Sequence, residues 1–442
     1  MDEKWPGESA AGTFAAPMLP ERPAFFPTIR ERITAFALYA LAYLYARNYL
    51  TLFEGEPRHR LWLLVFFAGF VAIAELLHRG VKRRKESWIW LGCAAVCLAS
   101  LLLGRGLAWS EAAEGWGDFT VFFLHAFAVW WLLSRSGLLC EGKSGRLLPL
   151  DALHGFVVIP FRHFFLRART VFFTLTHLRG ERPVNAAALG FSALALAAAA
   201  GLFAMAAGLL MRADSGFASL LEWAAERFRL NLDILFVLRF LFSLPIGAYL
   251  FGLLAGTART EPETLCQRGE RVCGALERMR RVPCGVWCAL VGVFCLFYGV
   301  FFAVQFRYLF GAFTRTLPEG FIVSQYAREG FFELCKVMTV NFALLWLTAR
   351  SSREALREKR LLLALVLTLL AESLLFAVVA ASKLLLYIDC FGFTPKRLLS
   401  SWLVCVLAFG CVCATVRLLR EKRSFRVWLI FSAVTAALLT LY

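Results

Sequence analysis

The stretch LLLALVLTLLAESLLFAVVAASK, from Leu361 to Lys383, decides the fold class. As a helix it is long enough to cross a hydrocarbon core of about 30 Å, and Glu372 lies near its middle. Similar runs recur along the 442 residues, of which 60% are hydrophobic and 18% are charged. A helix satisfies its backbone hydrogen bonds within one segment, whereas a membrane barrel alternates apolar and polar residues. The sequence therefore predicts an all-α, polytopic transmembrane helical bundle.

About eleven apolar stretches are long enough to be membrane spans. They comprise residues 33–53, 61–78, 87–104, 119–139, 186–211, 230–256, 283–306, 327–349, 361–383, 398–416 and 427–442. Residues 1–32, before the first of these stretches, contain five prolines and mixed charges, which predicts a flexible tail rather than a cleavable signal. We expect four parts in all, namely the cytoplasmic tail (1–32), a four-span part (33–139), a basic loop (140–185) and a seven-span membrane domain (186–442).

The net charge of +17 follows the arrangement of the loops. Lys and Arg are concentrated in the amino-terminal tail and in every second loop between the predicted spans. Because basic loops stay on the cytoplasmic side of a membrane, this alternation predicts a cytoplasmic amino terminus and an extracytoplasmic carboxyl terminus. The positive charge is therefore explained by the orientation of the protein in the membrane. Since no nucleic acid is needed to account for this charge, we expect no nucleic-acid partner.

A basic amphipathic helix is predicted over residues 161–178, on the cytoplasmic side. Phe161, Phe165 and Phe172 belong to an apolar series at helical spacing, and polar residues occupy the opposite side. Such a helix can lie on the membrane surface, where anionic headgroups attract basic side chains. The residues expected to contact lipid are Arg162, His163, Arg167 and Arg169. An equal alternative is a helix that packs under the bundle and has only a structural role.

Two polar stretches fall on the predicted extracytoplasmic face, SQYAREGFFEL (324–334) and YIDCFGFTPKR (387–397). Glu329 and Glu333 of the first stretch share one face of a helix with Lys336 just after it, at i, i+4 and i+7. Thr394 and Pro395 have the residue types of an N-cap and a first helical residue. The candidate polar site comprises Tyr326, Arg328, Glu329, Glu333, Lys336, Tyr387, Asp389, Thr394 and Arg397. Two interpretations remain open, a polar crevice for a ligand and a structural clamp between two helical hairpins.

Several polar residues fall within the predicted spans, where each must face the bundle interior or water. They are Arg47, Glu75, His125, Asp233, Arg239, Asn341, Glu372 and Lys383. Such residues either line a translocation path or form buried pairs with a structural role. Pro245 and Gly247 also lie within a span, and they predict either a broken helix or a tolerated kink.

The thirteen cysteines lie mostly within or beside the apolar spans, where cysteine behaves as a small hydrophobic residue. Cys284, Cys288 and Cys295 fall on one helical stripe that carries no histidine or carboxylate, which indicates packing rather than a metal site. No phosphate-binding glycine loop, HExxH motif or nucleophile elbow occurs. We therefore expect no metal and no cofactor, and no motif identifies a catalytic residue.

Three segments resemble a bacterial multi-pass membrane family that is built on a domain of unknown function. They are YAREGFFEL (326–334) followed by Asn341, LPIGAYLFGL (244–253) and LLLYIDCFGFTPKR (384–397). Family members carry the YAREGFF motif, and here Lys383 and Phe393 replace a usual arginine and leucine of the later motif. The resemblance implies a location in the bacterial inner membrane and a single site formed by the two extracytoplasmic stretches. It implies no biochemical activity.

Three functions are compatible with these features. The first is a non-enzymatic membrane protein that binds a small ligand or protein partner at the extracytoplasmic site, in a sensing or envelope role. The second is a secondary transporter or lipid flippase that uses Glu372 and Arg239. The third is an enzyme acting on a lipid-linked substrate, with Glu329, Glu333 or Asp389 as general base.

Overall fold

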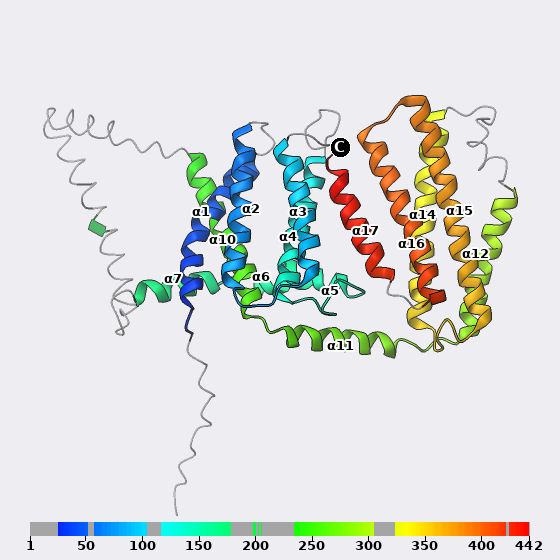
Figure 1. Ribbon diagram of the computed structural model, residues 1–442, viewed down its shortest axis with the longest axis horizontal. Coiled ribbons are helices and arrows are strands. Elements are labelled where there is room, and N and C mark those ends of the chain that lie inside the picture. The colour runs from blue at the N-terminus through cyan, green and yellow to red at the C-terminus, as the bar shows by residue number, and fades with distance from the viewer. Residues whose placement is uncertain are drawn as a thin grey trace, which may run out of the picture.

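The computed structural model describes residues 25–51, 57–103, 116–177, 198–199, 202, 205, 234–304, 323–420 and 424–441. The regular elements in these ranges are all helices, which confirms the all-α class (Figure 1). Seven of the described helices are long and apolar enough to cross a membrane. The protein is thus an α-helical integral membrane protein.

The first bundle combines the early helices with one later helix. It contains α1 (Ile29–Thr51), α2 (Pro57–Leu77), α3 (Lys85–Leu103), α4 (Trp116–Ser136) and α10 (Ile234–Arg259). Although the sequence grouped α10 with the later helices, it packs against α1, α2 and α4. Leu38, Trp131 and Phe251 are fully buried in the shared core.

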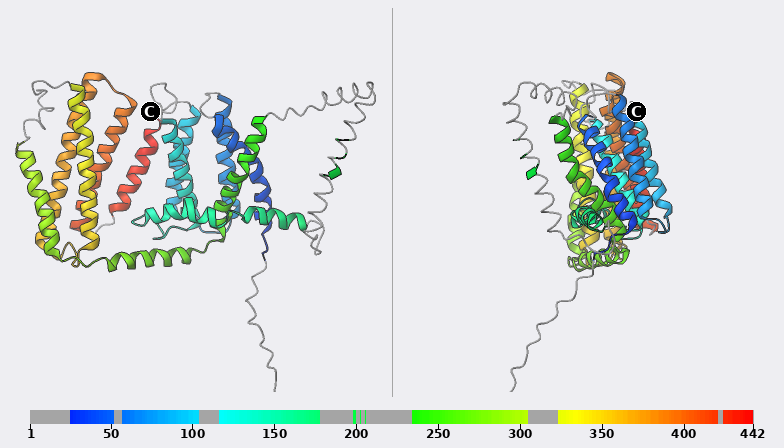
Figure 2. Two further views of the ribbon diagram at one scale, coloured as in Figure 1. Left: turned by 180° about the vertical axis from the view of Figure 1, so that it is seen from behind. Right: turned by 90° about the vertical axis from the view of Figure 1, so that its left-hand side faces the viewer.

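The second bundle consists of α12 (Cys284–Val304), α14 (Val323–Ser351), α15 (Arg360–Phe391) and α16 (Pro395–Arg420). Met338, Val366 and Phe376 are buried at its centre. The last helix, α17 (Ser424–Leu439), lies between the two bundles and packs against both α16 and α3 (Figures 1 and 2). It therefore connects the two cores.

Several helices lie across one end of the spans instead of along them (Figure 2). They are α5 (Leu148–Leu153), the π-helix η3 (His154–Val158), α6 (Ile159–Arg162), α7 (Leu166–Thr176) and α11 (Pro262–Arg278). Helix α11 runs beneath α17 from the first bundle to the second. We call this the basic end, and the opposite end, where α15 turns into α16, the motif end.

The expected count of about eleven spans is only partly confirmed. The stretches 61–78 and 427–442 correspond to the shorter apolar helices Leu61–Leu77 and Ser424–Leu439. Helix α1 covers residues 33–51 of the stretch 33–53 and is not among the seven. The stretch 186–211 lies outside the described residues apart from positions 198–199, 202 and 205.

The amphipathic segment differs from its prediction in two ways. The helix is interrupted at His163–Phe165, so that α6 and α7 are separate. Its polar side also turns toward the bundle, and Arg167 is only 4% exposed, whereas Phe165 is 75% exposed. Arg167 was therefore wrongly expected at the lipid surface. It donates to the Ala35 carbonyl (3.3 Å) and stacks on Tyr39, because this side of α7 packs against α1.

Candidate functional site

The two motif stretches meet where α14 packs against α15. Lys383, on α15, is 1% exposed, and its side chain lies against Gly330 of the YAREGFF motif. A Cβ atom at residue 330 would lie 3.3 Å from the Lys383 Cδ atom and closer still to Nζ. Glu333, one turn further along α14, interacts electrostatically with the Lys383 ammonium group. Glycine at 330 thus provides the space that this buried cation occupies.

The turn between α15 and α16 follows the prediction closely. Gly392 has a φ of +76°, which glycine adopts without strain, and α16 begins at Pro395. The Thr394 carbonyl accepts hydrogen bonds from the backbone N–H groups of Arg397 and Leu398, both at 3.0 Å. The Arg397 guanidinium donates to the Gly392 carbonyl and lies 4.1 Å from the centre of the Tyr387 ring. Arg397 therefore stabilises its own turn.

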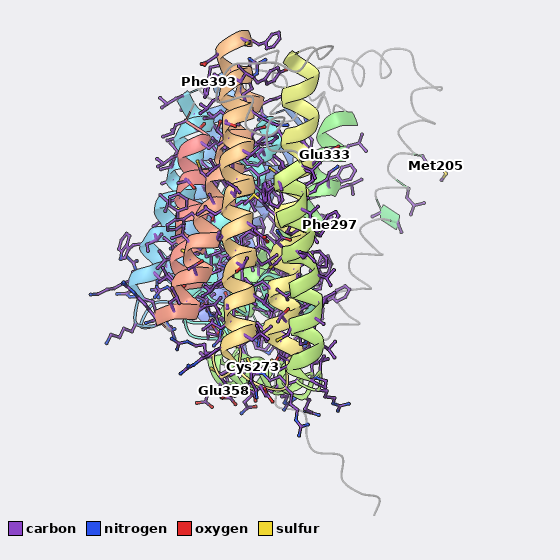
Figure 3. All side chains as sticks on the ribbon, turned by 90° about the vertical axis from the view of Figure 1, so that its right-hand side faces the viewer. Met205, Cys273, Phe297, Glu333, Glu358 and Phe393 are labelled. Carbon is purple, nitrogen blue, oxygen red and sulfur yellow. The ribbon has the colours of Figure 1, made fainter. Side chains whose placement is uncertain are left out.

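The other predicted residues of this site are placed less completely. Tyr326, Arg328 and Glu329 belong to the first turns of α14, and their side chains lie outside the described part of the structure. Glu333 and Lys336 are exposed and do not form the ion pair that their spacing allowed. Asp389 is exposed beside the turn. Figure 3 shows Glu333 and Phe393 toward the motif end, and Cys273 and Glu358 at the basic end.

A buried polar network lies deeper in the second bundle. The Asn341 side chain accepts a hydrogen bond from the Tyr298 hydroxyl (2.8 Å) and donates one to Ser373 Oγ (2.9 Å). Asn341 was predicted as an intramembrane polar residue, but its two partners were not. One asparagine thus joins α12, α14 and α15, which satisfies its amide within apolar surroundings.

Glu372 adjoins this network. Its neighbour is the thiol of Cys295, which donates to the Leu365 carbonyl (3.4 Å). Among the described atoms, the Glu372 Oε2 atom is buried and has no hydrogen-bond partner. A carboxyl group at this depth must face the bundle interior or water.

The polar residues predicted within the first bundle form structural contacts. Arg135 donates from Nε (3.0 Å) and Nη2 (3.0 Å) to the carboxylate of Glu75, and Arg83 lies 2.8 Å from the same group. Arg135 also donates to the carbonyls of His78 and Val81, which closes the end of α2. Glu75 therefore belongs to a structural ion cluster at the basic end.

The remaining intramembrane residues have separate surroundings. His125 Nε2 lies 2.9 Å from the Tyr45 hydroxyl, and Nδ1 lies 2.6 Å from the Val121 carbonyl. Arg47 is exposed on α1, Arg239 is half-buried on α10, and Asp233 lies outside the described residues. The structure does not bring Arg239 to Glu372, since they belong to different bundles.

A family model described as a domain of unknown function, DUF4153, matches residues 97–442. The chain belongs to this family. No curated protein and no solved structure matches the chain. The DUF4153 match includes α4, α10, the whole second bundle and α17, and therefore both motif stretches.

Helix α10, in the DUF4153 region, carries a glycine series that allows close packing, and its continuity through Pro245 fits a tolerated proline rather than a broken helix. Helix α10 runs unbroken through Pro245. A Cβ atom at Gly252 would overlap the Pro160 carbonyl oxygen, and one at Gly256 would lie 2.8 Å from His163 Nδ1. The glycines let α6 and the following turn contact the α10 backbone. Their spacing within LPIGAYLFGLLAG was the available signal.

A proline in this crossing segment explains a further contact. Pro160 has no N–H group, so it cannot donate to the carbonyl of residue 156. The hydroxyl of Tyr249, on α10, donates to the Phe156 carbonyl instead (3.0 Å). The π-helix η3 directly precedes this position. A single α10 tyrosine thus ties the π-helical segment before Pro160 to α10.

No metal centre is evident in the part of the chain that the structure describes. Within those ranges, no three His, Cys, Asp or Glu side chains are grouped closely enough to hold a metal ion. The expectations of no metal and no cofactor stay predictions.

Proposed function

We propose that this DUF4153 protein binds a ligand or partner through an anionic group at the motif end of the second bundle. The observation that carries the proposal is the burial of Lys383 against Gly330. An ionised side chain among apolar helices is costly and is characteristic of functional positions. Glu333 and the turn held by Arg397 lie toward the same end. A sensing or envelope role for a non-enzymatic protein fits this arrangement best.

The orientation in the membrane forms part of the same proposal. Helices α5–α7 and α11 lie at one end of the bundle, and the α15–α16 turn lies at the other (Figure 1). Because residues 259–281, which include α11, carry six arginines and basic segments stay cytoplasmic, we place the basic end in the cytoplasm and the motif end outside the bacterial inner membrane. The amino terminus is then cytoplasmic and the carboxyl terminus extracytoplasmic.

Two native cysteines provide a test of the orientation. Cys390 is exposed beside the α15–α16 turn, and Cys266 is exposed on α11. A membrane-impermeant maleimide added to intact cells should modify Cys390 and leave Cys266 unmodified until the cells are opened, as mapped by peptide mass spectrometry. Labelling of Cys266 alone from outside would reverse the orientation.

Replacement of Lys383 tests the binding site. Native mass spectrometry of the protein extracted from its own membrane should detect a bound species that is lost in Lys383→Met. Lys396→Met, at an exposed position on α16, serves as the control and should retain it. Equal occupancy in all three proteins, with unchanged melting temperatures, would contradict the proposal.

A second candidate, proton-coupled transport, is favoured by one observation. The Glu372 Oε2 atom is buried without a partner among the described atoms. Glu372→Gln should then abolish proton flux into proteoliposomes under an imposed membrane potential, while Glu354→Gln at the basic end leaves it unchanged. Equal flux in both variants would remove this candidate.

A further inference from the structure

A basic groove lies at the opposite end from the proposed binding site. It forms where η3 and α6 pass beside the junction of α10 and α11. Its polar lining consists of His154, Arg162, His163, Thr260, Thr264 and Arg268. Four of these six side chains are basic or imidazole groups, and the six come from two segments, 154–163 and 260–268, that are distant in the sequence. The groove is therefore a product of the tertiary structure.

The positions of the two histidines are set by backbone contacts. His154 Nδ1 lies 2.8 Å from the Leu150 carbonyl, and His163 Nδ1 lies 3.0 Å from the Ile159 carbonyl. Each Nδ1 must therefore carry the proton, because a carbonyl only accepts. The Nε2 atom of His154 then accepts from Arg268 Nη1 (3.2 Å). This contact positions the Arg268 guanidinium and leaves its other N–H groups available.

The positive charge in the groove is not neutralised by the described residues. Arg259, next to the groove lining, and Arg135 and Arg426, elsewhere in the protein, each pair with a carboxylate. Arg162 and Arg268, in contrast, form no ion pair within the described ranges.

The charges that act on the two imidazoles are also positive. Burial lowers the pKa of His154, and Arg268 lowers it further. Burial likewise lowers the pKa of His163, with further contributions from Arg162 and Arg259. Glu261 and Glu263 are exposed at the start of α11 and are not part of the groove lining.

Helix α11 places the groove beside the membrane surface. Leu265, Val272, Leu276 and Met279 follow one another at i, i+7, i+11 and i+14 and form one apolar stripe. Leu265 is buried, while Met279, just beyond the helix, is 50% exposed. A helix with an apolar stripe and charged side chains of both signs on its other sides is suited to the level of the lipid headgroups.

We propose that this groove binds a phosphate-bearing anion through Arg268 and Arg162. A guanidinium fork donates two parallel hydrogen bonds to phosphate oxygens, and the Thr264 hydroxyl lies in the same lining. The phosphate belongs either to an anionic phospholipid or to a soluble phosphate ester. The site goes beyond the proposed ligand site, because it uses different helices at the other end of the protein.

Thermal stabilisation of the full-length protein in neutral detergent tests this site. The probes are dioleoylphosphatidylglycerol, soluble glycerol 3-phosphate and, as the uncharged comparison, dioleoylphosphatidylcholine. We expect Arg162→Gln/Arg268→Gln to weaken apparent phosphatidylglycerol affinity at least tenfold. Arg278→Gln/Arg281→Gln removes the same charge from exposed positions outside the groove and should change affinity less than twofold.

Each outcome is decisive. Stabilisation by phosphatidylglycerol alone supports the site with a lipid as its ligand, and stabilisation by glycerol 3-phosphate as well supports the site with a soluble anion. Equal losses in the two double variants would indicate general electrostatic attraction and overturn the proposal, as would no loss in either. Arg162→Lys/Arg268→Lys retains the charge without the fork and should show an intermediate affinity, which also controls for misfolding.

Discussion

At the scale of single residues, most buried charges are compensated by partners from other elements. Glu31 shows the pattern, because its carboxylate accepts from the Thr28 backbone N–H (2.8 Å) and from Arg259 Nη2 (2.9 Å). The Thr28 hydroxyl in turn accepts from the Glu31 N–H (3.2 Å), so the pair forms a capping box at the start of α1. The same glutamate therefore begins one helix and holds the end of α10.

The buried carboxylate of Asp151 has no cationic partner in the described structure, which predicts that the stability of the protein depends measurably on pH. Burial raises its pKa from 3.8 to about 6, against the hydrogen bond from the Cys140 N–H (2.9 Å). The folded protein thus binds this proton more tightly than the unfolded chain, and its stability falls as the pH rises from about 4 to about 6. Asp151→Asn should nearly match the wild type at pH 4 and be more stable at pH 8 by about 3 kcal/mol.

Thermal unfolding between pH 4 and pH 8 measures this effect. Glu263→Gln, at an exposed position on α11, is the control and should preserve the wild-type slope. An Asp151→Asn protein with the wild-type pH slope would show that the carboxyl group is not the source.

At the scale of elements, the contact between α10 and the α6 segment depends on glycines of α10, which have no side chain to separate the two backbones. Gly252→Leu would place carbon atoms against the backbone of Pro160 and His163. Overpacking of this kind costs typically about 1–3 kcal/mol, and more where the obstacle is backbone. We expect a lowered melting temperature and faster proteolysis near residue 163.

Gly274→Ala is the matched control for Gly252→Leu. Residue 274 lies within α11, and a Cβ atom there meets nothing within 4 Å. Replacing glycine by alanine in a helix interior should therefore stabilise the protein slightly, by about 0.5–1 kcal/mol. A Gly252→Leu protein as stable as the wild type would refute the close crossing of α6 and α10.

At the scale of the whole molecule, α17 holds the two bundles together. Its apolar side contributes Ala433, Ala436 and Ala437 to the first core. Near its start, Arg426 Nη2 donates to the buried carboxylate of Glu86 at the start of α3 (2.8 Å). Trp402, on α16, donates to Thr435 Oγ1 (2.9 Å) on the other side.

Removal of the Arg426 charge should weaken this connection. Arg426→Gln leaves Glu86 buried without its cation, at a cost of about 2 kcal/mol, below that of a fully buried pair because the arginine is one-third exposed. Unfolding in detergent should shift to lower temperature and broaden as the bundles uncouple. Arg420→Gln, at an exposed position on α16, should leave the transition unchanged, and identical curves for both variants would argue against the connection.

The residues alone determined the helical class, most of the spans and the start of α16 after Thr394. These features follow from hydropathy and local backbone chemistry, which each segment carries by itself. Only the tertiary structure decided that Lys383 occupies the space beside Gly330, that Asn341 joins Tyr298 to Ser373 and that α10 belongs to the first bundle. These contacts join residues far apart along the chain, so they depend on which helices pack together. Apolar helix faces resemble one another, and only side-chain size and buried polar groups select the partner of each face.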